Sequence, residues 1–441
     1  MDWKQIENEA LEIFCKLLTF DTTNPPGNEK PAIDYVRGLL ESSGLTPVVV
    51  GAEEQRPNLV ARIPGKGTGP SLMLDSHIDV VPANEGNWTV PPFSGEIRDG
   101  WVWGRGAIDM KHMTAMSVSV MLNAARTGFS PSGDLVLSVT SDEETGAGLG
   151  AFYLVENHPD LIRADYALGE VGGMNITMNG HRIFPVQVAE KGICWLTLKV
   201  SGEAGHGSVH RKNTVPERVG QVLKRLSSLS FPSAPHPAAR AFIEALAQCS
   251  SFPNAQVLRM LARGVGTNTL LGKVVPEERA APLRAILGHT AQPTVVSCGS
   301  KINVVPSEGT ILMDCRVLPG TSPDEMRGMV AGHLGDLATV EMTKGLRGSA
   351  VSIDNPLYKT IEAVVAEMDP GSRVCPYLMP GFTNGGAYTQ LGTKYMGFTP
   401  VLMPPTVEFS SLFHTVDERL PVDGFKWGVR TLWEIVARFL G

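Results

Sequence analysis

The fold of this chain is decided by the stretch SLMLDSHIDVV, residues 71–81, in which an apolar run leads directly into polar side chains. Similar apolar runs recur in LVLSV at 135–139 and YAL at 166–168. None of these runs has a polar side, which is typical of central strands in a sheet that helices cover on both faces. Because helical stretches at 113–127 and 148–158 lie between the runs, the pattern predicts an α/β fold with a central sheet between two layers of helices.

A second domain is expected inside the first. At 441 residues the chain exceeds the usual size of a single hydrophobic core. Near residue 190 the pattern changes to an alternating strand, followed by helical and strand patterns of a smaller unit. A helical pattern after residue 350 returns the chain to the first domain. We therefore predict a first domain at 1–190 and 351–441, interrupted by an inserted α+β domain at 191–350.

Composition and charge argue against several functional classes. The formal net charge of -7 and the sequence pI near 5.8 provide no basic surface for nucleic acid, and Lys and Arg nowhere form a long run. No apolar stretch approaches the roughly 18 residues of a membrane span. The cysteines lie far apart without a CxxC pair, which argues against a disulfide framework and against a zinc–thiolate site. We expect a cytoplasmic protein with neither a nucleic-acid nor a membrane partner.

Polar side chains follow three of the predicted central strands. His77 and Asp79 are two positions apart and point to the same side of an extended chain. Glu143 and Glu144 follow the second apolar run, and Glu170 follows the third. In α/β sheets, ligands bind beyond the carboxyl ends of the strands. These side chains are therefore predicted to converge at one edge of the sheet.

Two further candidates come from loops. Asp109 lies in a glycine-rich loop that enters a helix, where a simple amino-terminal cap is the alternative. His414 lies in a loop before the last helix. The strand-end residues also have simpler interpretations, because such histidines are often structural and adjacent acids often form a solvated loop. Convergence of all these residues favours a metal site, and histidine with carboxylate suits Zn²⁺, or alternatively Mn²⁺ or Co²⁺.

Motifs along almost the whole chain resemble one family. In order they are LDSHIDVVP, WGRGAIDMK, SDEETG, ALGE, AGHGS, INVVPSE, DCRVLPG and FHTVDE. Together they resemble the M20 family of metallopeptidases, which includes carboxypeptidase G, aminoacylase-1, acetylornithine deacetylase and succinyl-diaminopimelate desuccinylase. The resemblance implies a catalytic domain with two metal ions at 1–190 and 351–441. It also implies a lid domain at 191–350, through which the chain would form a homodimer.

The resemblance implies a ligand set for two divalent ions. Asp109 would bridge the ions. His77 and Glu170 would complete one site, and Glu144 and His414 would complete the other.

Two more residues of the first domain acquire roles in this way. Glu143 would be the general base that takes a proton from a water held by both ions. Asp79 would hydrogen-bond His77 and fix the orientation of its ring.

Four residues of the inserted domain resemble substrate-contacting positions of the family. His206 in SGEAGHGSV would stabilise the tetrahedral oxyanion, in dimeric members from the neighbouring subunit, although a plain loop histidine is the simpler interpretation. Asn303 would contact substrate. Arg347 would bind a substrate carboxylate, and Arg316 would either contact substrate or support the lid sheet through a salt bridge.

Three positions depart from the family pattern. His112 stands where glycine is common, and Asn384 in GFTNGGAY stands near the aspartate of a GGTDA-like loop. His210 stands where proline is usual in the lid. These departures concern specificity and the contact between lid and substrate, not metal binding.

The leading hypothesis is a metal-dependent hydrolase that cleaves a peptide or amide bond in a small substrate. A dipeptide, the carboxy-terminal residue of a short peptide and an N-acyl amino acid all fit, so a peptidase and an N-acyl amino acid deacylase both stay open. A catalytically silent metal-binding protein is disfavoured because Glu143 and the ligand candidates are all present. A structural metalloprotein would retain metal without turnover.

Overall fold

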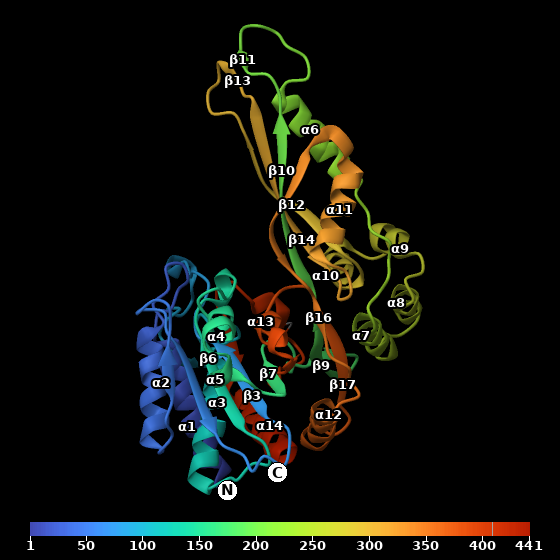
Figure 1. Ribbon diagram of the computed structural model, residues 1–441. Helices are drawn as coiled ribbons and strands as arrows, with labels where there is room; N and C mark the ends of the chain where they lie inside the picture. The colour runs from blue at the N-terminus through green and yellow to red at the C-terminus, as the bar shows by residue number, and fades with distance from the viewer. Residues whose placement is uncertain (408) are drawn as a thin grey trace. The chain divides into compact units, whose positions relative to one another are not determined.

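The chain folds into two units in the computed structural model, which describes residues 1–407 and 409–441 (Figure 1). Residues Met1–Val188, Val351–Tyr377 and Thr383–Gly441 form the first unit, and residues Ala189–Ala350 and Leu378–Phe382 form the second. Each unit has its own sheet and its own buried core. The assignment of the units as catalytic domain and lid stays a prediction.

The first unit is built on a mixed sheet whose central strands are parallel. Its strand order is β1–β2–β6–β3–β7–β18–β9, and β6, β3, β7 and β18 run in the same direction. Every residue of β3 and β6 is buried, as their apolar sequences predict. The strands, with β8 and β17 that also pair with β9, are β1 Val48–Val50, β2 Asn58–Ile63, β3 Leu72–His77, β6 Leu135–Thr140, β7 Tyr166–Gly169, β8 Ile176–Met178, β9 His181–Glu190, β17 Arg373–Met379 and β18 Lys394–Gly397.

Helices cover both faces of this sheet, which confirms the predicted fold class. On one face, Thr114 of α3 donates a hydrogen bond to Ser76 of β3. On the other, the hydroxyl of Tyr388 in α13 lies 2.9 Å from that of Ser138 in β6, which pairs with Asp75 of β3. Since Asp75 and Ser76 point to opposite sides of the strand, α3 and α13 lie on opposite faces. The helices are α1 Trp3–Leu18, α2 Lys30–Ser42, α3 Lys111–Thr127, α4 Ala151–Asn157, α5 Pro159–Ile162, α12 Pro356–Met368, α13 Gly385–Tyr388 and α14 Val422–Leu440.

The first and last helices pack together and against α3. Both are amphipathic, and the rings of Phe14 in α1 and Phe425 in α14 stack with centroids 4.8 Å apart. A small sheet of β4 (Ile97–Arg98), β5 (Trp101–Trp103) and β19 (Arg419–Pro421) precedes α14. Within the described residues, no helix is at once long enough and apolar enough to cross a membrane.

The second unit is a four-stranded antiparallel sheet with two helices on one face. The strand order is β12–β14–β10–β15, and α6 and α11 bury the inward side chains of β10 and β14, such as Leu198 and Ile311. This arrangement has the α+β character that the sequence predicts for residues 191–350. The elements are β10 Gly192–Ser201, β11 Gly205–His206, α6 Val215–Leu226, β12 Thr290–Cys298, β13 Val304–Val305, β14 Glu308–Val317, α11 Pro323–Leu334, β15 Thr339–Leu346 and β16 Ser349–Ala350.

Further helices extend the second unit beyond the sequence prediction. The first of these helices is α7 (Pro237–Gln248). The sequence does not indicate α8 (Asn254–Ala262), α9 (Thr267–Lys273) or α10 (Glu277–Leu287). Each of these three is short, and α10 contains Pro282. Helices of this length depend on tertiary packing more than on intrinsic propensity, so their local sequence carries only a weak signal.

Candidate metal centre

The candidate ligands of the first unit meet at one edge of its sheet. β3 ends at His77, Glu170 follows the last residue of β7, and Glu143 begins a 3₁₀ turn shortly after β6. Because β3, β6 and β7 are parallel, their carboxyl ends lie at the same edge. The structure thus brings together residues that are far apart in the sequence.

Asp109 lies between the two candidate histidines. Its Oδ1 is 3.1 Å from Nε2 of His77, and its Oδ2 is 3.1 Å from Nε2 of His414. Asp109 comes from the loop that enters α3, and His414 comes from the loop that precedes β19. Each oxygen of this carboxylate faces a different imidazole, an arrangement that suits a carboxylate shared by two cations.

A further carboxylate accompanies each histidine. Oε2 of Glu170 is 3.7 Å from Nε2 of His77, and Oε2 of Glu144 is 3.4 Å from Nε2 of His414. The side chain of His77 is fully buried, whereas that of His414 is 51% exposed. Among the described residues, two groups have donor atoms within 4.8 Å of one another, namely His77 with Asp109 and Glu144, and His77 with Glu143 and Glu170.

The crowded carboxylates disfavour their own ionised forms. Burial raises the pKa of Glu143 well above its usual value, and repulsion by Glu170 adds to the rise. Burial also raises the pKa of Glu144 and of Glu170. In the described structure, the Oε1 atoms of Glu144 and Glu170 are buried without a hydrogen-bond partner. Divalent cations would offset the repulsion and engage these oxygens, so the donor set fits such ions.

Both histidines favour the protonated form when only protein groups surround them. Hydrogen bonds to Asp109 and then to Glu144 raise the pKa of His414 to about 10. Burial lowers the pKa of His77, but hydrogen bonds to carboxylates, Asp109 first, raise it well above its usual value. Because an imidazole binds a metal in its neutral form, cation binding would release protons from this centre.

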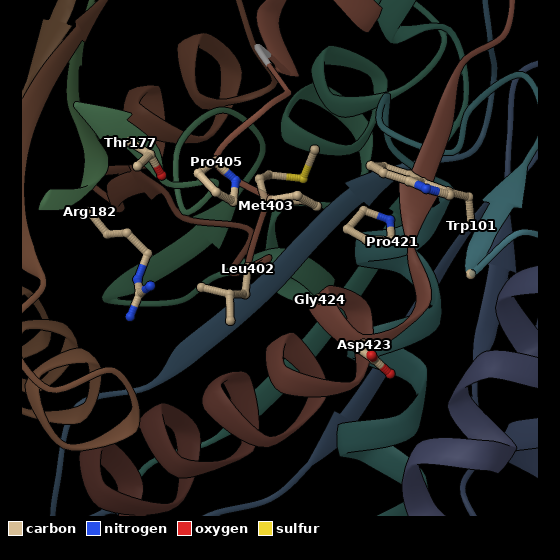
Figure 2. Close-up of a pocket in the computed structure, with 11 residues that line it drawn as sticks. Trp101, Thr177, Arg182, Leu402, Met403, Pro405, Pro421, Asp423 and Gly424 are labelled. Atoms are coloured by element: carbon tan, nitrogen blue, oxygen red, sulfur yellow. The ribbon is translucent and has the colours of Figure 1, made fainter. Parts of the chain in front are cut away.

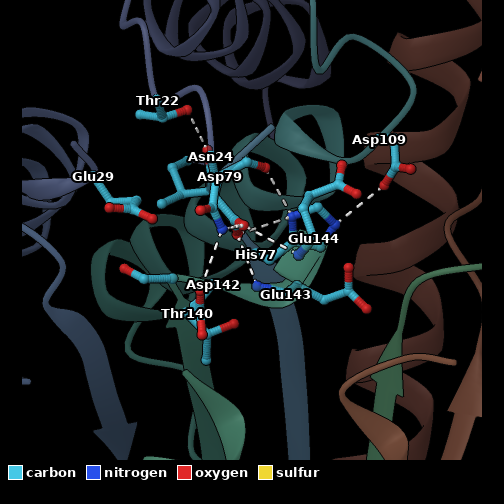
Figure 3. A network of polar contacts seen from close by, with 12 residues as sticks. Thr22, Asn24, Glu29, His77, Asp79, Asp109, Thr140, Asp142, Glu143 and Glu144 are labelled. Atoms are coloured by element: carbon cyan, nitrogen blue, oxygen red, sulfur yellow. Dashed lines mark hydrogen bonds and ion pairs between the residues drawn. The ribbon is translucent and has the colours of Figure 1, made fainter. Parts of the chain in front are cut away.

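Asp79 connects His77 to the turn that carries Glu143 and Glu144 (Figure 3). Its carboxylate accepts hydrogen bonds from the backbone N–H groups of Glu143 and Glu144, both at 3.1 Å. Nδ1 of His77 lies 2.9 Å from the backbone oxygen of Asp79 and 3.4 Å from its Oδ1. Asp79 is therefore placed to orient the imidazole and, in addition, to fix the turn.

Asn24 and Arg56 support the same turn, and neither is among the residues predicted from the sequence. Nδ2 of Asn24 donates to Oδ2 of Asp79 at 2.9 Å and to Oδ1 of Asp142 at 3.3 Å. Arg56 pairs with Asp142 at 3.0 Å and with Glu29 at 2.8 Å. The partners of Asn24 are 55 and 118 positions away along the chain, so no local pattern connects them.

Glu418 holds the loop that presents Asp109. Its buried carboxylate accepts a hydrogen bond from Nη1 of Arg105 at 2.6 Å. It also accepts bonds from the backbone N–H groups of Gly106, Ile108 and Asp109. Glu418 is not among the residues predicted from the sequence, although its place in the FHTVDE motif is a signal that points to it.

His206 and Asn303 lie next to each other in the second unit. β11 pairs with β13, and the N–H of Gly207 donates to the backbone oxygen of Asn303 at 2.8 Å. Both candidate residues are exposed. Nδ1 of His206 lies 2.7 Å from the hydroxyl of Ser208. Strand pairing thus joins two candidates that are distant in the sequence.

The two candidate arginines of the second unit have different surroundings. Arg316 forms a two-point ion pair with Asp314, with Nε 2.7 Å from Oδ1. Its Nη1 is buried and has no partner in the described structure. Arg347 is exposed. Lys191, which the sequence analysis missed, is 1% exposed, and burial and then Arg316 lower its pKa to about 7.

The three departures from the family pattern lie outside the ligand groups. Burial lowers the pKa of His112 to about 3, so its ring is neutral, and the ring packs edge-on against Phe14. Asn384 is buried beside the first residue of α13 and donates from Nδ2 to Oγ1 of Thr140 at 3.0 Å. His210 is exposed in the second unit.

A pocket with a volume of about 360 Å³ lies elsewhere in the first unit (Figure 2). It has two charged side chains in its lining, and one of them, Arg182, pairs with Asp369. No candidate ligand lines it, so it supplies no argument about the metal centre. The lining consists of Gly100, Trp101, Thr177, Arg182, Leu402, Met403, Pro404, Pro405, Pro421, Asp423 and Gly424.

Comparisons with known proteins agree that this chain is similar to peptidases and amide hydrolases. The model of the peptidase family M20/M25/M40 matches residues 73–438. The chain is 27% identical over 402 residues to the N-fatty-acyl-amino acid synthase/hydrolase PM20D1 of Mus musculus, covering 84% of this chain and 75% of that protein. It is 26% identical over 385 residues to the probable carboxypeptidase S-like 2 of Dictyostelium discoideum, covering 82% and 70%. The fold is similar to that of the M20 family metallo-carboxypeptidase Sso-CP2 from Sulfolobus solfataricus, with a TM-score of 0.74 and 16% identity, covering 98% of this chain and 99% of that one.

Proposed function

The chain belongs to the peptidase family M20/M25/M40, and from this premise we propose that it hydrolyses the amide bond of a small peptide or N-acyl amino acid with the help of two divalent cations. Membership of the family makes the chain a hydrolase of C–N bonds. The ligand assignment, the metal and the substrate below are the finer parts of the proposal.

The position of Asp109 between two histidines carries the proposal. We assign Asp109 as the bridging ligand because each of its oxygens faces one imidazole at 3.1 Å. His77 and Glu170 belong to one cation, and His414 and Glu144 belong to the other. Zn²⁺ is the proposed metal, with Mn²⁺ or Co²⁺ as alternatives, because the donor set combines imidazole with carboxylate and includes no thiolate.

Glu143 is the proposed general base. When bound, two divalent cations would acidify the attacking water, polarise the scissile carbonyl and offset the burial and repulsion that raise the pKa of Glu143. The carboxylate of Glu143 accepts the proton of the attacking water and then donates it to the nitrogen of the leaving amine. Asp79 keeps Glu143 in place through the backbone bond to its N–H.

A free carboxylate on the amine half of the substrate is the proposed recognition feature. The names of the two relatives, an N-fatty-acyl-amino acid hydrolase and a carboxypeptidase, both describe cleavage next to an amino acid with such a carboxylate. Arg347 is the proposed partner of this group, and the unpaired Nη1 of Arg316 is a second. His206 is assigned to the oxyanion and Asn303 to a substrate contact.

A substrate panel with the Glu143→Gln variant tests this function. The metal-loaded protein is assayed on mixed dipeptides, on short peptides and on N-acyl amino acids of increasing acyl length, each with its carboxylate free or amidated. Turnover of the free-carboxylate substrates that is lost in a variant with unchanged metal content supports the proposal. Preference for peptidyl or for acyl substrates separates peptidase from deacylase. No turnover on any member of the panel by metal-loaded protein speaks for a silent metal-binding protein.

A homodimer through the second unit is also proposed. β12 is an edge strand of the four-stranded sheet, and Val295 and Val296 on it are about half exposed. Light scattering behind a sizing column should give twice the chain mass, and Val296→Lys should give the monomer mass, whereas a monomeric parent contradicts this part. The cytoplasm is the proposed compartment, because the cysteines lie far apart in the sequence without a CxxC pair, which argues against a disulfide framework.

A further inference from the structure

A carboxylic acid lies one layer below the candidate metal centre, in a strand that is otherwise apolar before its end. Asp75 is 0% exposed in the middle of β3. It is two residues before His77, so both side chains point to the same face of the sheet. On the neighbouring strand it lies beside Gly169, because Leu74 pairs with Leu168. Asp75 therefore lies in the sheet one step before the metal-binding edge, next to the strand positions that precede His77 and Glu170.

The hydroxyl of Tyr395 reaches this carboxylate across β7. Tyr395 belongs to β18, and β7 separates β18 from β3. Its hydroxyl donates to Oδ2 of Asp75 at 3.1 Å. The side chain can cross β7 only because residue 169 is glycine, since a Cβ at that position would lie 1.8 Å from the hydroxyl oxygen. The hydroxyl thus occupies the place that a side chain at position 169 would fill.

Two further glycines allow close contacts, one with the ring of Tyr395 and one with the backbone of Glu170. A Cβ at Gly385 would lie 2.6 Å from the ring of Tyr395. A Cβ at Gly397 would lie 2.0 Å from the backbone oxygen of Glu170, so this backbone approaches β18 closely. The N–H of Phe398 also donates to the oxygen of Gly169 at 2.9 Å. β18 therefore supports the Gly169–Glu170 peptide from its backbone and from the tyrosine side chain.

We propose that Tyr395, held by Asp75, is a positioning residue that keeps Glu170 in its metal-binding place. Loss of the hydroxyl would open a gap beneath Gly169 and leave the buried carboxylate of Asp75 with one partner fewer, so the Gly169–Glu170 peptide would lose its support on that side. Glu170 would then shift, while Glu144 and His414 belong to other segments and would keep their positions. The inference rests on the proposed function, because it takes Glu170 as a metal ligand.

A cobalt titration tests the proposal without an activity assay. Metal-stripped protein is titrated with Co²⁺, and the visible absorbance with a competing chelator gives the affinity of each equivalent. In Tyr395→Phe, one of the two equivalents should bind about 10-fold more weakly or worse, and the other should be unchanged. Asp75→Asn should weaken the same equivalent. The matched control is Tyr358→Phe, which removes a hydroxyl from another buried tyrosine of the first unit and should leave both affinities unchanged.

The outcomes separate this inference from the proposed function. Two equivalents in the wild type with identical affinities in Tyr395→Phe and Asp75→Asn overturn the positioning role and leave the two-metal hydrolase standing. The positioning role is also overturned if both equivalents weaken together with a fall in melting temperature beyond that of Tyr358→Phe, because that result describes a general structural role. A wild type that binds no Co²⁺ overturns the proposed function and the inference with it.

Discussion

The candidate residues of the first unit are mostly buried and held by neighbouring groups, whereas three of the four in the second unit are exposed. Asp79 is tied to the backbone of Glu143 and Glu144, and Glu418 is tied to the loop of Asp109. The exposed ring of His206, by contrast, lies beside a serine of its own loop, and Arg347 is open to solvent. The first group is already arranged without a ligand, so its role should be measurable from the binding of cations alone. The role of the second group should be measurable only from its effect on the substrate.

The largest effect is expected at the carboxylate between the two histidines. Asp109→Asn keeps the shape of the side chain but removes the charge that both cations would share. We expect metal content to fall from two equivalents per chain to one or none, and hydrolysis to become undetectable. Elemental analysis after gel filtration measures the metal. Two retained equivalents would contradict the bridging role.

A smaller but still large effect is expected for the proposed base. Glu143→Gln should lower kcat by about 10²- to 10⁴-fold, because the amide cannot accept a proton from water. Metal content should stay at the wild-type level, since Glu143 is not assigned as a ligand. A loss of one metal equivalent in this variant would instead place Glu143 among the ligands, as its proximity to His77 and Glu170 allows.

The exposed arginine of the second unit should affect substrate binding alone. Arg347→Ala is expected to raise KM about 10- to 100-fold for substrates with a free carboxylate, because a hydrogen bond to a charged group is lost. Neither kcat nor metal content should change, and amidated substrates should show no difference. Arg327→Ala, at a partly exposed arginine of α11, is the matched control. An equal rise in KM for amidated substrates would show that Arg347 does not bind the substrate carboxylate.

The smallest expected effect is the change in metal affinity over a single pH unit. The neighbouring carboxylates raise the pKa of metal-free His414 to about 10, and this proton must leave before the imidazole binds a cation. Affinity should therefore increase as pH rises from 6 to 8, by about 10-fold per pH unit for each proton released. Isothermal titration in buffers of different ionisation enthalpy counts these protons. An affinity independent of pH over this range would mean that His414 is not a ligand.

The sequence predicts the α/β fold and the meeting of strand-end residues because both follow from short, local rules. Buried strands read as apolar runs, and parallel strands end at one edge, so His77 and Glu170 can be brought together without coordinates. The roles of Asn24, Arg56 and Lys191 cannot be predicted in this way, because their surroundings depend on how loops fold and on which residues become buried. The role of Tyr395 cannot be predicted from the sequence either, since its contact with Asp75 depends on a glycine in the strand between them.

The central claim is that two cations share Asp109, and anomalous diffraction at the zinc edge tests it most directly. Crystals of zinc-loaded protein should show two anomalous peaks at the carboxyl edge of the first sheet, one beside His77 and Glu170 and one beside His414 and Glu144, with the Asp109 carboxylate between them. A single peak, or two peaks without Asp109 between them, would contradict the claim.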